Sequence, residues 1–179
     1  IEYDDSFLPL EGFDIVLMNP PYKEARRGSE TTYAFDTARI GILFAWFIEI
    51  AVTLLSESGQ IGTIVPMSAV STQRMKSLRR LLNKRCSELR VANFAWRPAK
   101  VFQDTNLAVS VILARRSKGR KRLLTTTYNK WSAGQLPTLL GQLRFVDAAD
   151  YVRNDLWPKI GDPTEQEILT KIYQHEHRL

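Results

Sequence analysis

An amide, two prolines and an aromatic ring follow one another directly after an apolar run, in the order Asn19-Pro20-Pro21-Tyr22. The run, residues 13–18, is rich in β-branched residues, which predicts a buried strand that the two prolines end. Each proline biases the residue before it toward extended backbone, so Asn19 should lie just past the carboxyl end of the strand. Ligands bind at that edge in open α/β sheets. The sequence therefore predicts a site that combines a polar amide, a backbone carbonyl and an aromatic ring.

These groups suit the methylation of an exocyclic amine. An adenine amino group is a poor nucleophile because its lone pair is delocalised into the ring. Two acceptors facing its N–H bonds, the Asn19 side-chain oxygen and the Pro20 carbonyl, would favour a tetrahedral nitrogen with its lone pair aimed at an electrophile. Pro21 would fix the turn, and Tyr22 would stack on the base for roughly 1–3 kcal/mol. The alternative is an ordinary Pro-Pro turn with Tyr22 packed on the surface.

The tetrapeptide resembles motif IV of the amino-methyltransferases that use S-adenosylmethionine. From about Asp5 to Arg116, the chain is similar to the γ-class adenine-specific (N6) DNA methyltransferases of restriction–modification systems. The resemblance implies an α/β fold, a partial class I (Rossmann-like) methyltransferase with a mixed sheet, flanking helices and its first strands missing. It also implies S-adenosylmethionine as cofactor and duplex DNA as partner, with methyl transfer to a flipped adenine. RNA-adenine and protein-glutamine methyltransferases share the tetrapeptide and remain alternatives.

A second aromatic residue matches the same family. Val101-Phe102, followed by residues 109–115, resembles motif VIII of the γ-class enzymes. The match implies that Phe102 stacks on the far face of the extruded adenine, opposite Tyr22. The alternative is a loop phenylalanine folded onto the core. This second ring favours a nucleic-acid base over a protein glutamine as the substrate.

Two further positions match residues that contact the cofactor's adenine in the resembling family. Asp5 takes the acidic position, although a serine separates it from the following aromatic, and Phe47 takes an aromatic position. A solvated acidic loop and plain core packing are the respective alternatives. Class I folds hold their cofactor mainly on a glycine-rich turn, and the sequence shows none after a strand. We therefore expect a catalytic segment that is inactive alone and lacks the main cofactor-binding motif.

The composition fits one core and a polyanionic partner. The chain has 179 residues, is 44% hydrophobic and carries a net charge of +6 with a pI near 9.6. Its single cysteine, Cys86, excludes an internal disulfide and fits a reducing cytosol, so we expect a cytoplasmic location. The apolar stretch 40–55 is too short for a membrane span. The two histidines, His175 and His177, lack partner ligands, so no metal is expected.

Two basic segments are candidates for phosphate contacts, which give affinity without sequence information. Arg26 and Arg27 lie in the polar loop after Tyr22. Arg115, Arg116 and Lys118 begin the densest basic run, residues 115–122. A solvated loop and a solvated linker are the alternatives.

The hydrophobic pattern predicts alternating helices and strands. A helix over 39–57 should end at Gly59 in a left-handed cap, and a helix over 71–85 should expose Arg79 on a solvated basic face. A helix followed by a strand implies that the strand after it runs parallel to the first. The remaining expected elements are strands over 61–66, 89–96, 107–114 and 123–128, a turn or helix over 135–143, and a helix over 163–175.

We therefore expect two regions. Residues 1–118 would form the C-terminal, substrate-side half of a methyltransferase catalytic domain. Residues 119–179 would form a basic linker and an extension toward a target-recognition domain that is not present. Further partners would be the missing N-terminal half or a specificity domain or subunit. A non-catalytic, truncated module that binds nucleic acid is the alternative from a different functional class.

Overall fold

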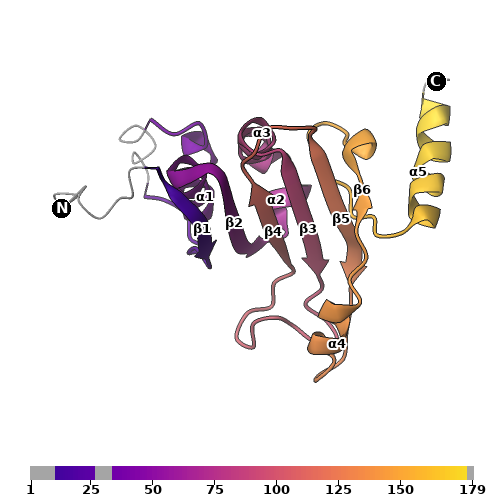
Figure 1. Ribbon diagram of the computed structural model, residues 1–179. Coiled ribbons are helices and arrows are strands. Elements are labelled where there is room, and N and C mark those ends of the chain that lie inside the picture. The colour runs from indigo at the N-terminus through magenta and orange to yellow at the C-terminus, as the bar shows by residue number, and fades with distance from the viewer. Residues whose placement is uncertain (1–10, 27–33, 177–179) are drawn as a thin grey trace.

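A mixed β-sheet of six strands organises the computed structural model, which describes residues 11–26 and 34–176 (Figure 1). Neighbours β1 and β2 are parallel, as are β3 and β5, and the other three pairs are antiparallel. The mixed sheet and the parallel first pair confirm the predictions. In spatial order the strands are β1 (Phe13–Met18), β2 (Leu55–Pro66), β4 (Val109–Arg115), β3 (Glu88–Phe94), β5 (Arg122–Asn129) and β6 (Val146–Asp147).

The helices α1 and α3 cover one face of this sheet. Phe44 and Ile48 of α1 and Leu78 of α3 are buried in one apolar core with the strand residues Ile61 and Val91. In contrast, α5 stands at the end of the sheet farthest from β1 (Figure 1). None of the described helices is long and apolar enough to cross a membrane. The helices are α1 (Leu43–Leu54), α2 (Ser68–Ser71), α3 (Lys76–Arg85), α4 (Leu136–Gly141) and α5 (Pro163–Glu176), with 3-10 turns at Ala38–Ile40, Gln73–Met75 and Ala149–Tyr151.

The predicted helix over 39–57 is too long, and the prediction of a helix cap at Gly59 is wrong. The helix ends at Leu54, and Gly59 lies within β2. Leu55 already pairs with Phe13 of β1, and the Arg116 N–H donates to the Gly59 carbonyl at 2.8 Å. A β-carbon at Gly59 would lie 2.6 Å from the Phe13 carbonyl oxygen. The glycine is therefore needed for the close approach of β1, which extends β2 toward its amino end.

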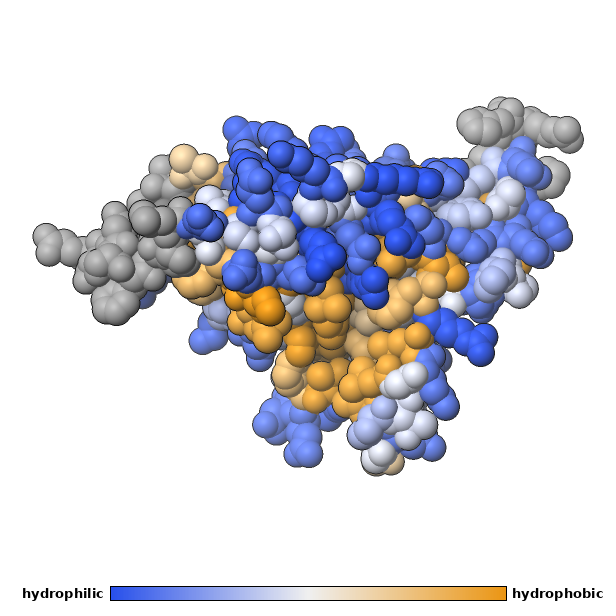
Figure 2. Space-filling model, in the orientation of Figure 1, coloured by the Kyte–Doolittle hydropathy of each residue, from blue (hydrophilic) through white to orange (hydrophobic). Residues whose placement is uncertain are grey.

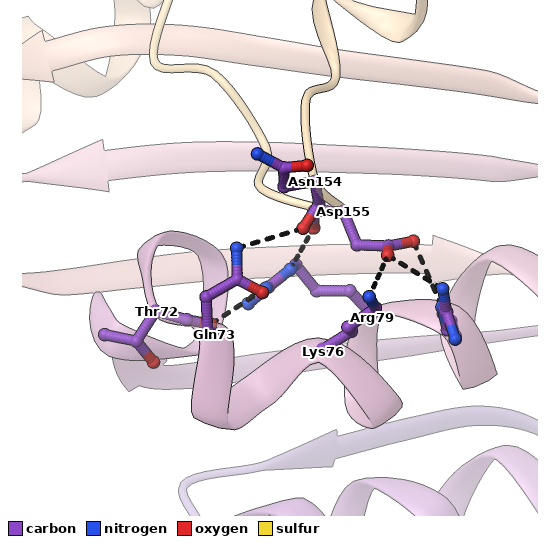
Figure 3. Close-up of polar contacts among 7 residues, drawn as sticks. Thr72, Gln73, Lys76, Arg79, Asn154 and Asp155 are labelled. Atoms are coloured by element: carbon purple, nitrogen blue, oxygen red, sulfur yellow. Dashed lines mark hydrogen bonds and ion pairs between the residues drawn. The ribbon is translucent and has the colours of Figure 1, made fainter.

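The expected solvated position of Arg79 is also wrong, because this side chain is fully buried. Its guanidinium group donates to three backbone carbonyls, of which Figure 3 shows those of Thr72 and Asp155. Nη1 reaches Ala69 at 2.7 Å, Nη2 reaches Thr72 at 2.8 Å, and Nε donates to Asp155. Burying an arginine is costly unless its donors are satisfied, and these carbonyls give each of its three nitrogens an acceptor. Arg79 therefore joins α2 and α3 to a segment that follows β6 in the chain.

That segment, residues 152–161, is held by further contacts. The Asp155 carboxylate pairs with Lys76 at 3.3 Å and with Arg80 at 3.1 Å, and these cations lower the pKa of Asp155. Gln73 donates to the Asn154 carbonyl at 3.2 Å. Asn154 and Asp155 both have left-handed backbone, with φ of 51° and 61°. The contacts in Figure 3 thus stabilise a conformation that is uncommon for residues other than glycine.

The opposite face of the sheet is open near β1. Ile15 and Leu17 of β1 are 64% and 77% exposed, and Leu113 of β4 is 47% exposed. Leu17 and Leu113 meet over Gly62, where a β-carbon would lie 2.6 Å and 3.3 Å from them. Figure 2 shows apolar surface gathered over the sheet on the face turned to the viewer. The prediction that the first strand is buried is therefore wrong in the described part of the chain, because β1 is an edge strand with one uncovered face.

Cys86 supplies a prediction about stability at high pH. Its thiol is buried at the end of α3, and burial raises its pKa to about 11, although Lys121 and Arg116 act in the opposite direction. A raised pKa stabilises the fold below the unfolded value of 9.0 and the effect is lost as pH rises through about 11. We expect the free energy of unfolding to fall by on the order of 2 kcal/mol between pH 8 and 11 through this group.

Urea denaturation of the wild type and of Cys86→Ala at both pH values measures this effect. The alanine variant keeps the titration of the lysines and removes only that of the thiol. An identical pH dependence in both proteins would contradict the prediction.

Candidate active site

The strand β1 delivers Asn19 to the carboxyl end of the parallel pair. Met18, its last residue, pairs with Thr63 of β2, and Asn19 follows at once. The Asn19 side chain is exposed, whereas Pro20 is buried and Pro21 is exposed. The structure therefore places the amide where the sequence predicts it, at an open strand end.

Tyr22 is anchored at both ends of its side chain. Its hydroxyl donates toward Oδ1 of Asn19 at 3.1 Å and toward the Ile64 carbonyl of β2 at 3.0 Å. Its ring makes an edge contact with Phe44 of α1, with centroids 6.4 Å apart. Burial raises the pKa of the Tyr22 phenol, which stays protonated at neutral pH. Tyr22 thus ties the turn that contains Asn19 to both the sheet and the helix layer.

A groove of about 400 Å³ begins beside Asn19 and runs over the open face of the sheet. Its walls come from three strands and are mostly apolar, so it offers contact area with one polar group at its end. The lining residues are Leu17, Met18, Asn19, Gly62, Thr63, Ile64, Val111 and Leu113.

Phe102 lies in the loop between β3 and β4 and packs against a second apolar cluster. The buried members of this cluster are Ala92, Phe94, Val109 and Trp131. Ile64 and Val111 pack against the same cluster and also line the groove beside Asn19. Phe102, a half-buried ring, therefore shares an apolar cluster with two residues of the groove but does not itself line the groove.

The candidate cofactor contacts are described only in part. Phe47 lies on α1 and is 46% exposed, so it is not a full member of the core. Asp5 and Arg27 lie outside the described residues. No group of three or more histidine, cysteine, aspartate or glutamate side chains that could hold a metal ion occurs in the described ranges.

The candidate phosphate-binding residues divide between two ends of the sheet. Arg26 is exposed and follows Tyr22 closely. Arg115 pairs with Gln60 in the middle of β2, whereas Asn19 follows the residue that pairs with Thr63, nearer the carboxyl end. At about 3.3 Å per strand residue, the two positions are on the order of 10 Å apart. Any DNA contact from Arg115 or the residues after it would therefore lie away from a base held at Asn19.

Arg116 and Lys118 differ in their surroundings. Arg116 is half-buried, and its Nη1 donates to the Leu55 carbonyl at 2.8 Å. Lys118 is exposed on the connection to β5. Arg116 therefore has a structural role at the junction of α1 and β2, whereas Lys118 is accessible to a polyanion.

Sequence reasoning missed two contributors to the site. The Ile64 carbonyl and the Phe44 ring anchor Tyr22, yet both come from elements far along the chain. The apolar patterns placed each residue in a strand or helix. They carry no signal that pairs either of them with Tyr22.

A family model described as "Eco57I restriction-modification methylase" matches residues 2–102 of the 179. The match covers more than half of the chain and includes both Asn19-Pro20-Pro21-Tyr22 and Phe102. No curated protein matches the chain.

Solved structures share the fold at low sequence identity. A nuclease-deletion mutant of the Type ISP restriction-modification enzyme LlaGI, in complex with a DNA substrate mimic, matches with a TM-score of 0.62 and 14% identity over 82% of this chain and 18% of that one. The type I restriction-modification methyltransferase subunit from Streptococcus thermophilus matches with a TM-score of 0.53 and 18% identity over 78% and 33%.

A putative class I S-adenosylmethionine-dependent methyltransferase from Listeria monocytogenes matches with a TM-score of 0.56 and 13% identity over 76% of this chain and 43% of that one. This chain therefore spans less than half the length of each of these three structures. The likeness shows the class I methyltransferase fold and confirms the fold class predicted from the sequence.

Proposed function

The chain belongs to the Eco57I restriction-modification methylase family, and from this premise we propose that it is the amine-binding segment of an adenine-specific DNA methyltransferase. The reaction is transfer of a methyl group from S-adenosylmethionine to N6 of an adenine that has swung out of duplex DNA. The observation that carries the proposal is the position of Asn19, an exposed amide at the end of β1 beside an apolar groove.

The residues of this chain act on the amine. The Asn19 side-chain oxygen and the Pro20 carbonyl accept the two N–H bonds, which directs the nitrogen lone pair away from the ring. Pro21 holds the turn, and the Tyr22 and Phe102 rings take the two faces of the base. Stacking offsets part of the few kcal/mol needed to extrude a base. No strong base is required, because the amine becomes acidic as its new bond forms.

S-adenosylmethionine, when bound, supplies an electrophilic methyl group on a sulfonium sulfur. Within residues 11–26 and 34–176, no two glycines lie close together directly after a strand. This supports the inference that the chain lacks a glycine-rich cradle, in which case Phe47 and Asp5 would contribute at most one edge of the cofactor site. The main site would lie on further polypeptide.

The open side of the sheet supports the need for more polypeptide. In the described part of the chain, β1 has a strand partner on one side only, and the exposed Ile15, Leu17 and Leu113 side chains form an apolar face. The N-terminal half of the methyltransferase domain, on the same chain or another subunit, is the proposed occupant. Residues 1–118 would be the substrate-side half, and 119–179 would lead toward target recognition. Strands β5 and β6 lie after residue 118 but belong to the same sheet as β1 to β4. The proposed boundary therefore does not separate two sheets.

Labelled methyl transfer to adenine in duplex DNA tests the function. The assay compares this chain with the longest native polypeptide that contains it. Transfer by the long polypeptide alone supports the proposal. Transfer by the short chain would contradict the claim that this chain lacks the main cofactor site. If RNA or protein is labelled and DNA is not, the proposal of DNA as the substrate is wrong. If none is labelled, while DNA binds without the cofactor in a salt-sensitive way, the chain is a binding module.

Phe102 provides a prediction for the base. In the long polypeptide, Phe102→Ala should lower kcat/KM for DNA by about 10–100-fold, because one stacking partner is worth roughly 1–3 kcal/mol. The KM for S-adenosylmethionine should stay the same. Phe102→Trp keeps a stacking surface and should retain most activity. Equal losses in both variants, or an unchanged kcat/KM in Phe102→Ala, would assign the ring to the second apolar cluster alone.

A further inference from the structure

The Tyr22 hydroxyl lies between two oxygen atoms that can only accept hydrogen bonds. It is 3.1 Å from Oδ1 of Asn19 and 3.0 Å from the backbone oxygen of Ile64. A phenol carries one proton, so it can fully satisfy only one of these acceptors at a time. The Ile64 carbonyl is fixed in β2, whereas the Asn19 amide is exposed and free to turn. The amide is therefore the group that can relieve the competition.

A half-turn of the Asn19 amide about its last torsion removes the competition. The two ends of an amide have nearly the same size, so Nδ2 then takes the place of Oδ1 beside the phenol. Nδ2 donates to the phenol oxygen, and the phenol proton goes to the Ile64 carbonyl. Both contacts of the phenol then join a donor to an acceptor. Oδ1 faces away from Tyr22, with both of its lone pairs available to an incoming N–H.

We propose that this chain of hydrogen bonds, from Asn19 through the Tyr22 hydroxyl to Ile64, selects the end of the Asn19 amide that meets the substrate amine. The inference rests on the proposed function. The substrate amine donates hydrogen bonds through its N–H groups, so it needs the oxygen end of the Asn19 amide. If the NH2 end faced the amine instead, two donors would face each other and no hydrogen bond would form. The Tyr22 hydroxyl is thus a positioning group, distinct from the ring that stacks on the base.

The surroundings of Tyr22 keep this group in place. The Phe44 edge contact fixes the ring, and burial keeps the phenol protonated at neutral pH. The relay runs from the exposed turn to a strand of the sheet, so it ties the amide to the rigid part of the fold. A hydroxyl at the end of a mobile side chain would not be held in a fixed position and could not orient the amide.

Tyr22→Phe in the longest native polypeptide tests the relay, because it keeps the ring and removes the hydroxyl. The loss of one orienting hydrogen bond should lower kcat roughly tenfold. The KM values for DNA and S-adenosylmethionine, and the dissociation constant for DNA without cofactor, should stay within twofold. An unchanged kcat would overturn the proposal. So would a parallel loss of DNA affinity or of thermal stability, because that pattern marks a structural hydroxyl.

A double-mutant cycle with Asn19→Asp separates orientation from general support. A carboxylate has two equivalent oxygens and no end to select. Removing the hydroxyl should therefore cause no further loss in the aspartate variant, measured in single turnover with excess enzyme so that slow transfer is counted. Equal losses in both backgrounds would overturn the relay. A wild-type polypeptide that transfers no methyl group would overturn the proposed function, and the relay with it.

Discussion

An Asn19→Ala variant of the intact polypeptide is expected to lose methyl transfer to adenine by at least 10²–10³-fold, which is the usual effect of removing one preorganised polar group that meets a reacting centre. The side chain is exposed, and its hydrogen bond within the described structure goes to Tyr22. Its loss should therefore leave the fold intact. Binding of S-adenosylmethionine should be nearly unchanged, because Asn19 acts on the amine and not on the methyl donor.

Asn83→Ala is a matched control for this experiment. Asn83 is an exposed asparagine near the end of α3, away from the groove. The same chemical change there should alter neither transfer nor cofactor binding. Single-turnover transfer and calorimetric titration of the cofactor measure the two quantities separately. A joint loss of transfer and cofactor affinity in Asn19→Ala would show a structural role for the amide.

Arg79→Met should destabilise the chain by about 3–5 kcal/mol, because each buried carbonyl left without its donor costs roughly 1–3 kcal/mol. The substitution removes the donors to the carbonyls of Ala69, Thr72 and Asp155, and methionine offers none in return. For a chain of this length the midpoint of thermal unfolding should fall by roughly 10 °C. Differential scanning calorimetry and urea denaturation measure the two effects.

Arg80→Ala is the control for Arg79. Arg80 pairs with the same aspartate at 3.1 Å, but its side chain is 62% exposed. Exposed ion pairs contribute at most about 1 kcal/mol, so this variant should be nearly as stable as the wild type. If the two arginine variants unfold at the same temperature, the buried hydrogen bonds do not account for the attachment of residues 152–161.

Most of the strands could be predicted because each is a short apolar run rich in β-branched residues. Val109–Arg115 and Glu88–Phe94 fall within two residues of their predicted positions. The beginning of β2 could not be predicted, since residues 55–60 lack strong alternation and Gly59 indicates the end of a helix. That segment is extended because β1 pairs with Leu55 and the residue after β4 hydrogen-bonds to Gly59. Both partners are distant in sequence.

The burial of Arg79 shows the same limit. The helical pattern assigns Arg79 to the polar face, because that pattern groups it with the other basic residues of the helix. In the structure those other basic residues are exposed or half-exposed, and Arg79 alone among them is buried. Its acceptors include a carbonyl at position 155, in a loop whose left-handed backbone no local pattern announces. The turn after β1 was easier to predict from the sequence, because two consecutive prolines determine its backbone geometry locally. The anchor of Tyr22 on Ile64 depends on the pairing of β1 with β2 and became visible only in the folded chain.

The edge position of β1 has a consequence for regulation. Among the described residues, the strand that presents Asn19 is hydrogen-bonded to a neighbouring strand on one side only, and one of its faces meets solvent. Edge strands open locally at a lower free-energy cost than central ones, so the amide is held least firmly when the sheet is incomplete. Assembly of the full sheet would raise the fraction of time that the amide spends in its active geometry. If so, completion of the fold would control catalysis, and we would expect a segment with an incomplete sheet to transfer methyl groups poorly.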